Sequence, residues 1–136
     1  MTIHKPRPNK GRRVGLDPAI EKIDYNREKP TFSLQFIDPE YCITCCDKDE
    51  KASFADMLRN MSQMTWNELR NAPRHGMGSE KIDQKAIKRP IPQGVTEDVT
   101  FLAFRFHALK PMVGYRVRET FHIIWFDRNF TLYDHG

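Results

Sequence analysis

Alternating hydrophobic and polar positions dominate the last third of the chain and predict strands there. In the stretch "VTFLAFRFHAL", the side chains of Leu102, Phe104 and Phe106 fall on one side of an extended backbone, and those of Arg105 and His107 fall on the other. We therefore expect a sheet with one apolar face and one exposed face that carries cationic and imidazole groups.

The same alternation continues toward the C-terminus. It predicts strands over residues 112–118 and 120–127, and in the second of these Phe121, Ile123 and Trp125 are expected to share a face. Polar turn residues then separate this strand from a predicted last strand over residues 130–134.

Helical spacing replaces alternation in the middle of the chain. Residues 47–64 carry apolar side chains at three- and four-residue intervals, which predicts an amphipathic helix. Residues 65–72 predict a second, short helix, and residues 73–98 predict a long connection. With an earlier strand predicted over residues 31–38, this order predicts an α+β fold, in which two helices pack on one face of an antiparallel sheet of about four to five strands.

Length and charge refine this organisation. The chain has 136 residues, a formal net charge of +4 and a pI of about 9.1. We expect a flexible basic arm over residues 1–13 and a single α+β domain over residues 14–136. No apolar run reaches the roughly 18 residues of a membrane span, so we expect a cytoplasmic protein without a membrane partner. The basic balance favours a polyanion such as nucleic acid as the partner.

Three cysteines, Cys42, Cys45 and Cys46, lie together in "CITCC". An odd number argues against a disulfide framework. The Cys-x-x-Cys spacing suits two ligands of a zinc ion, but a structural zinc site needs four, and the sequence has no second pair of this kind. We therefore favour free thiols and expect neither a metal nor a cofactor, while a zinc-stabilised domain remains a third interpretation that metal analysis of the purified protein would test.

The stretch "FRFHALKPMVGYRVRETFHIIWFDRNFTLYDHG" resembles the RelE/ParE superfamily of toxin ribonucleases. In that family two helices precede a meander of strands, and "GYRV" and "FHIIWFD" fill the places of its hairpin and its apolar strand. The resemblance is one of pattern over about Lys48 to Gly136, and the first thirty residues have no counterpart in the family. It implies a RelE-like outline, RNA or the ribosome as the target, and a neutralising antitoxin as a protein partner.

Metal-independent RNA cleavage needs a base for the 2′-hydroxyl, a cation for the phosphate and help for the departing 5′ oxygen. Histidine suits the proton steps, and the planar fork of arginine suits the phosphate. On these grounds the candidate catalytic residues are His122, Arg105, His107, Tyr133 and His135. The candidate nucleic-acid-binding residues are Arg74, His75, Arg116, Arg118 and Lys81.

Strand parity predicts that Arg105, His107 and His122 share the exposed face with either Arg116 or Tyr115. Tyr133 and His135 are expected at the edge of this face.

Structural roles for these residues remain open from the sequence. His122 lies in an apolar, aromatic-rich strand, as a hydrogen-bonded sheet histidine would, and Tyr133 could cap the edge of the core. The alternative function is a non-enzymatic protein-interaction module, such as an accessory protein of a phage or mobile element. Salt dependence separates the two functions, because affinity for phosphates falls steeply with salt.

Overall fold

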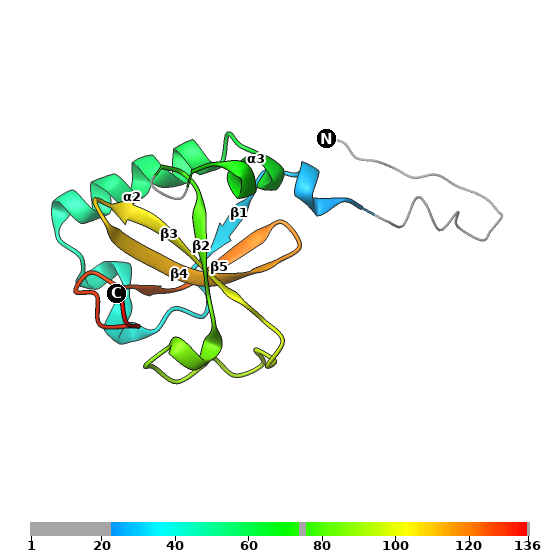
Figure 1. Ribbon diagram of the computed structural model, residues 1–136. Coiled ribbons are helices and arrows are strands. Elements are labelled where there is room, and N and C mark those ends of the chain that lie inside the picture. The colour runs from blue at the N-terminus through cyan, green and yellow to red at the C-terminus, as the bar shows by residue number, and fades with distance from the viewer. Residues whose placement is uncertain (1–22, 74–75, 136) are drawn as a thin grey trace.

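The protein has an α+β fold in the computed structural model, which describes residues 23–73 and 76–135 (Figure 1). Five strands form one sheet in the order β1-β5-β4-β3-β2, in which β1 runs parallel to β5 and the other neighbours are antiparallel. The strands are Thr31–Ser33 (β1), Ser79–Ile82 (β2), Phe101–His107 (β3), Lys110–Val117 (β4) and Thr120–Phe126 (β5). The α-helices are Lys48–Met61 (α2) and Trp66–Asn71 (α3). The predicted fold class is confirmed, whereas the predicted basic arm lies outside the described residues.

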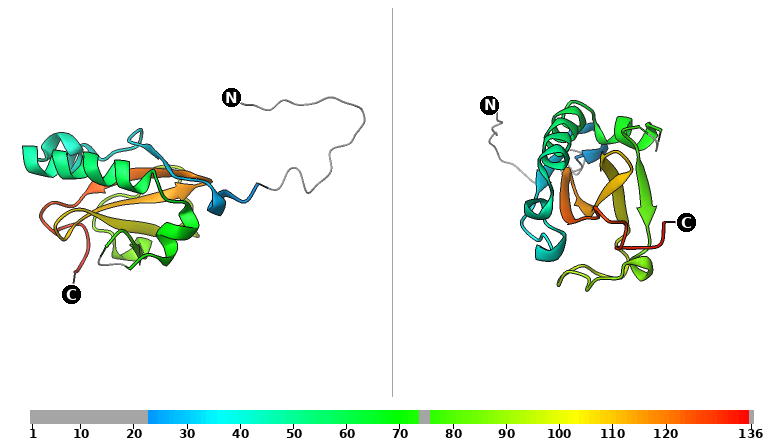
Figure 2. Two further views of the ribbon diagram at one scale, coloured as in Figure 1. Left: turned by 90° about the horizontal axis from the view of Figure 1, so that it is seen from above. Right: turned by 90° about the vertical axis from the view of Figure 1, so that its left-hand side faces the viewer.

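Both helices begin where the sequence indicates. The backbone N–H of Glu50 donates to the Asp47 side chain, and the Glu50 side chain accepts from the Asp47 N–H, each over 2.8 Å. This reciprocal capping box starts α2, and Thr65 with Glu68 makes a second one at α3. Figure 2 shows α2 lying along one face of the sheet, and its buried residues include Phe54 and Met57. The two helix predictions are confirmed.

A hydrophobic core fills the space between the helices and the sheet. It combines apolar side chains of α2 and α3 with those from the facing side of three strands. Its buried residues are Cys46, Phe54, Met57, Met61, Trp66, Leu69, Phe104, Phe106, Met112, Phe121, Ile123 and Phe126.

A second hydrophobic cluster covers the opposite face of the sheet, where the sequence predicted an exposed basic surface. The segment between β2 and β3 lies over this face, and its Lys88 N–H donates to the carbonyl of Leu132 over 2.8 Å (Figure 1). The buried residues of this cluster are Ile82, Phe101, Ala103, Val113, Ile124, Trp125, Leu132 and Tyr133. The predicted open face is therefore wrong.

Bulges in the sheet break the strand parity on which that prediction depended. Val113 pairs with Trp125, whereas Gly114 pairs with Ile123, so Ile124 is an extra residue in β5. Ile124 and Trp125 both pack into the second cluster, while Ile123 packs on the helix side. The expectation that Trp125 shares a face with Phe121 and Ile123 is therefore wrong.

Three predicted element ranges also differ from those in the structure. The strand over residues 31–38 is only three residues long, because the Ser33 hydroxyl accepts from the Gln35 N–H and the chain turns. The connection over residues 73–98 contains β2 and the 3₁₀ helix Gln84–Ala86 (η4). No strand forms at residues 130–134, where the Asp127 carboxylate instead accepts hydrogen bonds from two backbone N–H groups and turns the chain back. Within the described parts, no helix has the length and hydropathy needed to cross a membrane.

Candidate functional site

A pocket at the end of the sheet brings together three of the five candidate catalytic residues. It consists of two adjoining hollows that share Glu80, Arg105, Leu109, Tyr133 and His135 as lining residues. We refer to these five residues as the C-terminal pocket. It lies on the side of the second cluster, since Tyr133 belongs to that cluster and Arg105 follows Ala103 by two positions in β3.

The histidine of this pocket is fixed by a buried carboxylate. His135 Nε2 lies 3.0 Å from Asp127 Oδ2, and the Asp127 side chain has no exposed surface. Because a carboxylate only accepts hydrogen bonds, Nε2 carries the proton in this pair and Nδ1 of the neutral ring is the acceptor. The ring of Tyr133 stacks on that of His135 with centroids 4.0 Å apart. Asp127 and Tyr133 therefore fix both the tautomer and the plane of the imidazole.

The turn that carries His135 is built by the same carboxylate. Asp127 directly follows β5 and accepts from the backbone N–H groups of Thr131 at 2.8 Å and Leu132 at 3.2 Å. Phe130 within this turn has a φ of 57°, a conformation that bulky residues rarely adopt, and its ring meets that of His135 edge-on. The chain is thus held in a tight path that returns His135 to the sheet.

Strand pairing brings Glu80 and Arg105 to the same side of the sheet. Glu80 of β2 pairs with Ala103 of β3, and Arg105 is two residues further along β3. Such diagonal neighbours lie about 7–8 Å apart at their backbones, within reach of long side chains. The pocket therefore offers a carboxylate, a guanidinium and an oriented imidazole.

Glu80 and Asp127 were not among the candidates from the sequence. Glu80 fell in a predicted loop, although the alternation in "SEKI" was a signal for a strand. Asp127 was interpreted as a turn residue, and its pairing with His135 depends on a turn of eight residues that local patterns do not predict.

His107 does not face the C-terminal pocket. The pairing of β3 with β4 shifts between Arg105 and His107, and this irregularity turns His107 toward α2. Its Nδ1 lies 2.7 Å from the hydroxyl of Ser53 in α2. The expectation that Arg105 and His107 share a face is therefore wrong.

His122 lies at the opposite end of the sheet. It pairs with Tyr115 of β4, whereas Arg105 pairs with Pro111, and four residues of strand span about 13 Å. The His122 ring stacks on Tyr115 with centroids 5.1 Å apart and contacts Phe36 at 5.4 Å. The structure therefore does not combine His122 with Arg105 in one site.

The half-buried position of His122 predicts a pH dependence of stability. Burial lowers the pKa of His122 below its ordinary value of 6.5, and its Nδ1 is buried without a hydrogen-bond partner. The unfolded chain thus takes up a proton before the folded one does. Stability present above pH 6.5 should be lost as the pH falls through the folded-state value.

The variant His122→Phe keeps an aromatic ring but cannot titrate. Urea unfolding at several pH values should give a flatter decline of the unfolding free energy for this variant than for the parent. If the unfolding free energy of both proteins declines equally with falling pH, His122 is not the group responsible.

The described candidates for nucleic-acid binding are not among the residues that line the C-terminal pocket. Arg116 places its guanidinium 4.3 Å from the centre of the Trp66 ring, on the helix side of the sheet, and not on the expected exposed face. Burial and the charge of Arg70 lower the pKa of Arg116. Arg116 and Arg118 line one shallow hollow, and Lys81 is exposed on the edge strand β2. Arg74 and His75 lie outside the described residues.

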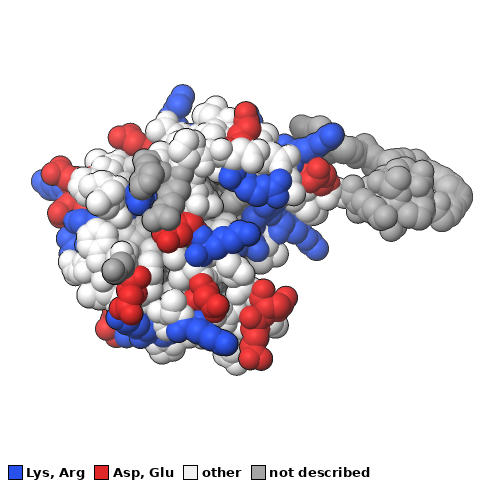
Figure 3. Space-filling model, in the orientation of Figure 1, with Lys and Arg blue, Asp and Glu red and all other residues white. Residues whose placement is uncertain are grey.

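Lysine and arginine side chains gather on this part of the surface. Figure 3 shows basic side chains over α3 and the hairpin between β4 and β5, and α3 carries Arg70. We refer to Arg70, Arg116 and Arg118 as the hairpin cluster. Arg70 and Arg116 repel each other, while the acids Asp24 and Glu119 offset part of this repulsion, and an anion bound there would offset more of it.

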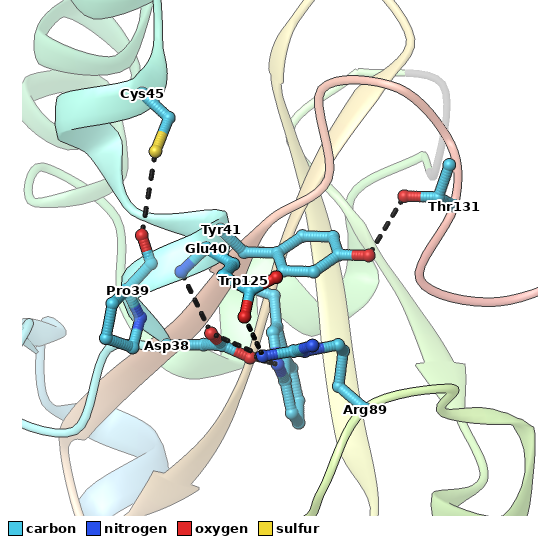
Figure 4. Close-up of polar contacts among 8 residues, drawn as sticks. All are labelled: Asp38, Pro39, Glu40, Tyr41, Cys45, Arg89, Trp125 and Thr131. Carbon is cyan, nitrogen blue, oxygen red and sulfur yellow. Dashed lines mark hydrogen bonds and ion pairs between the residues drawn. The ribbon is translucent and has the colours of Figure 1, made fainter.

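An ion pair outside the C-terminal pocket holds the segment between β2 and β3 to the sheet. Arg89 Nε donates to Asp38 Oδ2 over 2.8 Å, and Trp125 Nε1 donates to the same oxygen over 3.2 Å (Figure 4). Burial raises the pKa of Asp38, but the hydrogen bonds from Arg89, from the Glu40 backbone and from Trp125 outweigh it and hold that pKa below its ordinary value. This network holds the segment between β2 and β3 against the second cluster.

No group of three His, Cys, Asp or Glu side chains is arranged to hold a metal ion within residues 23–73 and 76–135. Cys42, Cys45 and Cys46 are free cysteines that differ in exposure. Comparison of the chain with family models, with curated proteins and with solved structures found no match.

Proposed function

We propose that this protein is a metal-independent endoribonuclease and that the C-terminal pocket is its active site. The observation that carries the proposal is the convergence of Arg105 and His135 on one pocket, with His135 oriented by the buried Asp127. A base held by a buried carboxylate beside a cation is the arrangement that proton abstraction next to a phosphate requires.

The residues of the pocket have separate roles in this reaction. The Nδ1 atom of His135 takes the proton of the 2′-hydroxyl, and the 2′ oxygen attacks the neighbouring phosphorus. The guanidinium of Arg105 stabilises the charge that grows on the phosphate oxygens. The bond to the 5′ oxygen breaks, and that oxygen takes a proton from water. The products are a 2′,3′-cyclic phosphate and a 5′-hydroxyl.

Two surface features that take no part in the reaction itself favour RNA as the substrate. Leu109 is 64% exposed and Phe130 is 42% exposed at the rim of the pocket, where unstacked bases can pack on them. The hairpin cluster supplies positive charge at another edge of the sheet, on the helix side. The resemblance to the RelE/ParE superfamily supports the same substrate and suggests an antitoxin protein as a partner.

Replacing His135 or Arg105 by alanine should lower RNA cleavage by about 10²–10⁴-fold, which is the usual contribution of a positioned acid–base group. The purified full chain is incubated with a single-stranded RNA in EDTA, and the products are analysed for 2′,3′-cyclic phosphate ends. A matched oligonucleotide with 2′-deoxyribose at the cleaved position should be resistant. Induced expression in bacteria, with growth and bulk RNA followed over time, is the parallel measurement in cells.

Lys51→Ala is the matched control, because Lys51 is a cation on the exposed side of α2. This variant should cleave RNA as the parent does. Cleavage that survives in both His135→Ala and Arg105→Ala, or that is lost in His122→Ala alone, would contradict the assignment of the pocket.

A non-enzymatic interaction module is the second candidate function. The exposed Leu109 and Phe130 favour it, because apolar side chains at a pocket rim also suit a protein partner. RNA binding that weakens steeply with salt supports the first function, whereas a partner held by apolar contacts would respond little to salt.

A further inference from the structure

Cys42 and Cys45 lie at the two ends of one hydrogen-bonded turn. The N–H of Cys45 donates to the carbonyl of Cys42 over 2.9 Å, and Ile43–Cys45 form a 3₁₀ helix (η3) with Cys42 as its N-cap. Such a bond between residues i and i+3 keeps their Cα atoms within about 7 Å. Disulfides span Cα separations of about 4.4–6.8 Å, so a disulfide can close across this turn with little movement of the backbone.

We propose that Cys42 and Cys45 form a redox-active dithiol that exchanges with low-molecular-weight disulfides. The site is separate from the C-terminal pocket, and the inference does not depend on the proposed ribonuclease activity.

The surroundings of Cys42 favour its thiolate. Hydrogen bonds from the Thr44 side chain and from the backbone of Thr44 and Ile43 lower the pKa of Cys42 below its ordinary value, and they outweigh the opposing effect of burial. Cys42 is therefore the attacking group.

Cys45 is placed to complete the reaction. It is exposed, and its Sγ donates only a weak, 3.6 Å hydrogen bond to the carbonyl of Pro39, as Figure 4 shows. Rotation of one side chain would release this contact, and the thiol would then be able to turn toward Cys42.

Cys46 is excluded from this chemistry although it is adjacent in sequence. It is buried in the helix-side core, and burial together with the nearby Glu50 carboxylate raises its pKa to about 11. A thiol that is both buried and protonated neither attacks nor is attacked readily. The three cysteines thus have three different roles: attacking, resolving and inert.

The exchange balances with a disulfide RS–SR as the oxidant. The Cys42 thiolate attacks one sulfur of RS–SR, forms a mixed disulfide and releases RS⁻. The Cys45 thiol loses its proton and attacks the Cys42 sulfur, which forms the Cys42–Cys45 bond and releases a second RS⁻. The two thiols of the protein are oxidised by two electrons, and RS–SR is reduced to two thiols once the RS⁻ groups take up the two protons.

The test uses the full chain, first reduced and then equilibrated with mixtures of oxidised and reduced glutathione. The reaction is quenched with acid, free thiols are alkylated in denaturant, and disulfide-linked peptides are mapped by mass spectrometry. We expect one Cys42–Cys45 disulfide, with Cys46 recovered in alkylated form. Circular dichroism of each variant establishes that it is folded.

Three single variants separate the roles of the cysteines. Cys46→Ala should form the same disulfide as the parent. Cys45→Ser should stop at glutathione bound to Cys42, and Cys42→Ser should lose the intramolecular bond. The proposal is overturned if the folded parent stays fully reduced in oxidised glutathione, if Cys42 and Cys45 each retain a separate glutathione, or if the disulfide contains Cys46.

Discussion

Replacing Glu50 by alanine should lower the free energy of unfolding by about 3 kcal/mol, because it removes the buried carboxylate that the half-buried cations Lys110 and Arg128 share, together with part of the capping box of α2. The Glu50 side chain has no exposed surface. It accepts from Lys110 Nζ at 2.5 Å and from Arg128 Nε at 2.8 Å, and it also completes the capping box of α2. For a domain whose total stability is about 5–15 kcal/mol, this loss is a large fraction.

Urea unfolding followed by fluorescence of the buried Trp66 and Trp125 measures this effect. The matched control is Asp49→Ala, because Asp49 is an exposed acid in the same first turn of α2. Losing the exposed charge should cost at most about 1 kcal/mol. Equal destabilisation by the two substitutions would contradict the role assigned to Glu50. Exchanging Glu50, Lys110 and Arg128 together for methionine should recover part of the loss, since the half-buried cations would then be removed together with their partner.

The lowered pKa of Glu50 also predicts how the free energy of unfolding depends on pH. Burial raises the pKa of Glu50, but the hydrogen bonds from Arg128, Lys110 and the Asp47 backbone outweigh it and lower that pKa from 4.5 to about 2. The stabilisation that ionised Glu50 supplies is therefore complete above pH 4.5 and is lost as the pH falls toward about 2. In the Glu50→Ala variant this part of the acid sensitivity should disappear.

The variant Gly114→Ala should destabilise the protein by about 3 kcal/mol or more, because β4 and β5 approach too closely there for a side chain. A Cβ atom at Gly114 would overlap the carbonyl oxygen of His122 and would come within 3.0 Å of the Cα of Ile123. Both neighbours are backbone atoms of β5, so the strands would have to separate. This pairing is at the centre of the sheet and contains the bulge that turns Trp125 toward the second cluster.

Gly76→Ala is the control for this substitution. A Cβ atom at Gly76 would meet only the carbonyl oxygen of Pro73, at an ordinary contact distance of 3.6 Å. Thermal and urea unfolding should therefore distinguish the two variants clearly. A Gly114→Ala protein as stable as Gly76→Ala would mean that β4 and β5 do not approach each other as described.

Local patterns predicted the helices correctly because their determinants are local. Capping residues and the spacing of Phe54, Met57 and Met61 fix α2 within one stretch of chain. The hairpin strands were predicted for the same reason, since alternation extends over each strand in turn. The short β1 was predicted too long, because the Ser33 side chain turns the chain just where alternation continues.

The candidate site was predicted in part. Arg105, Tyr133 and His135 were expected near one another and line one pocket. His107 and His122 were expected with them, but a shift in strand pairing turns His107 to Ser53, and His122 lies at the other end of the sheet. Alternation gives the side of a strand on which a residue lies, but it gives neither the bulges nor the position along the sheet.

The sequence by itself determined the helices, the three long strands and a concentration of ionisable groups near the C-terminus. Only the tertiary structure decided which of these groups meet. The turn at Asp127 returns His135 to the sheet, and the segment that contains Arg89 buries the face predicted to be open. Helix caps and alternation act between neighbours in the chain. These contacts instead join residues far apart in sequence or depend on how a turn closes. They form only when the whole sheet is assembled.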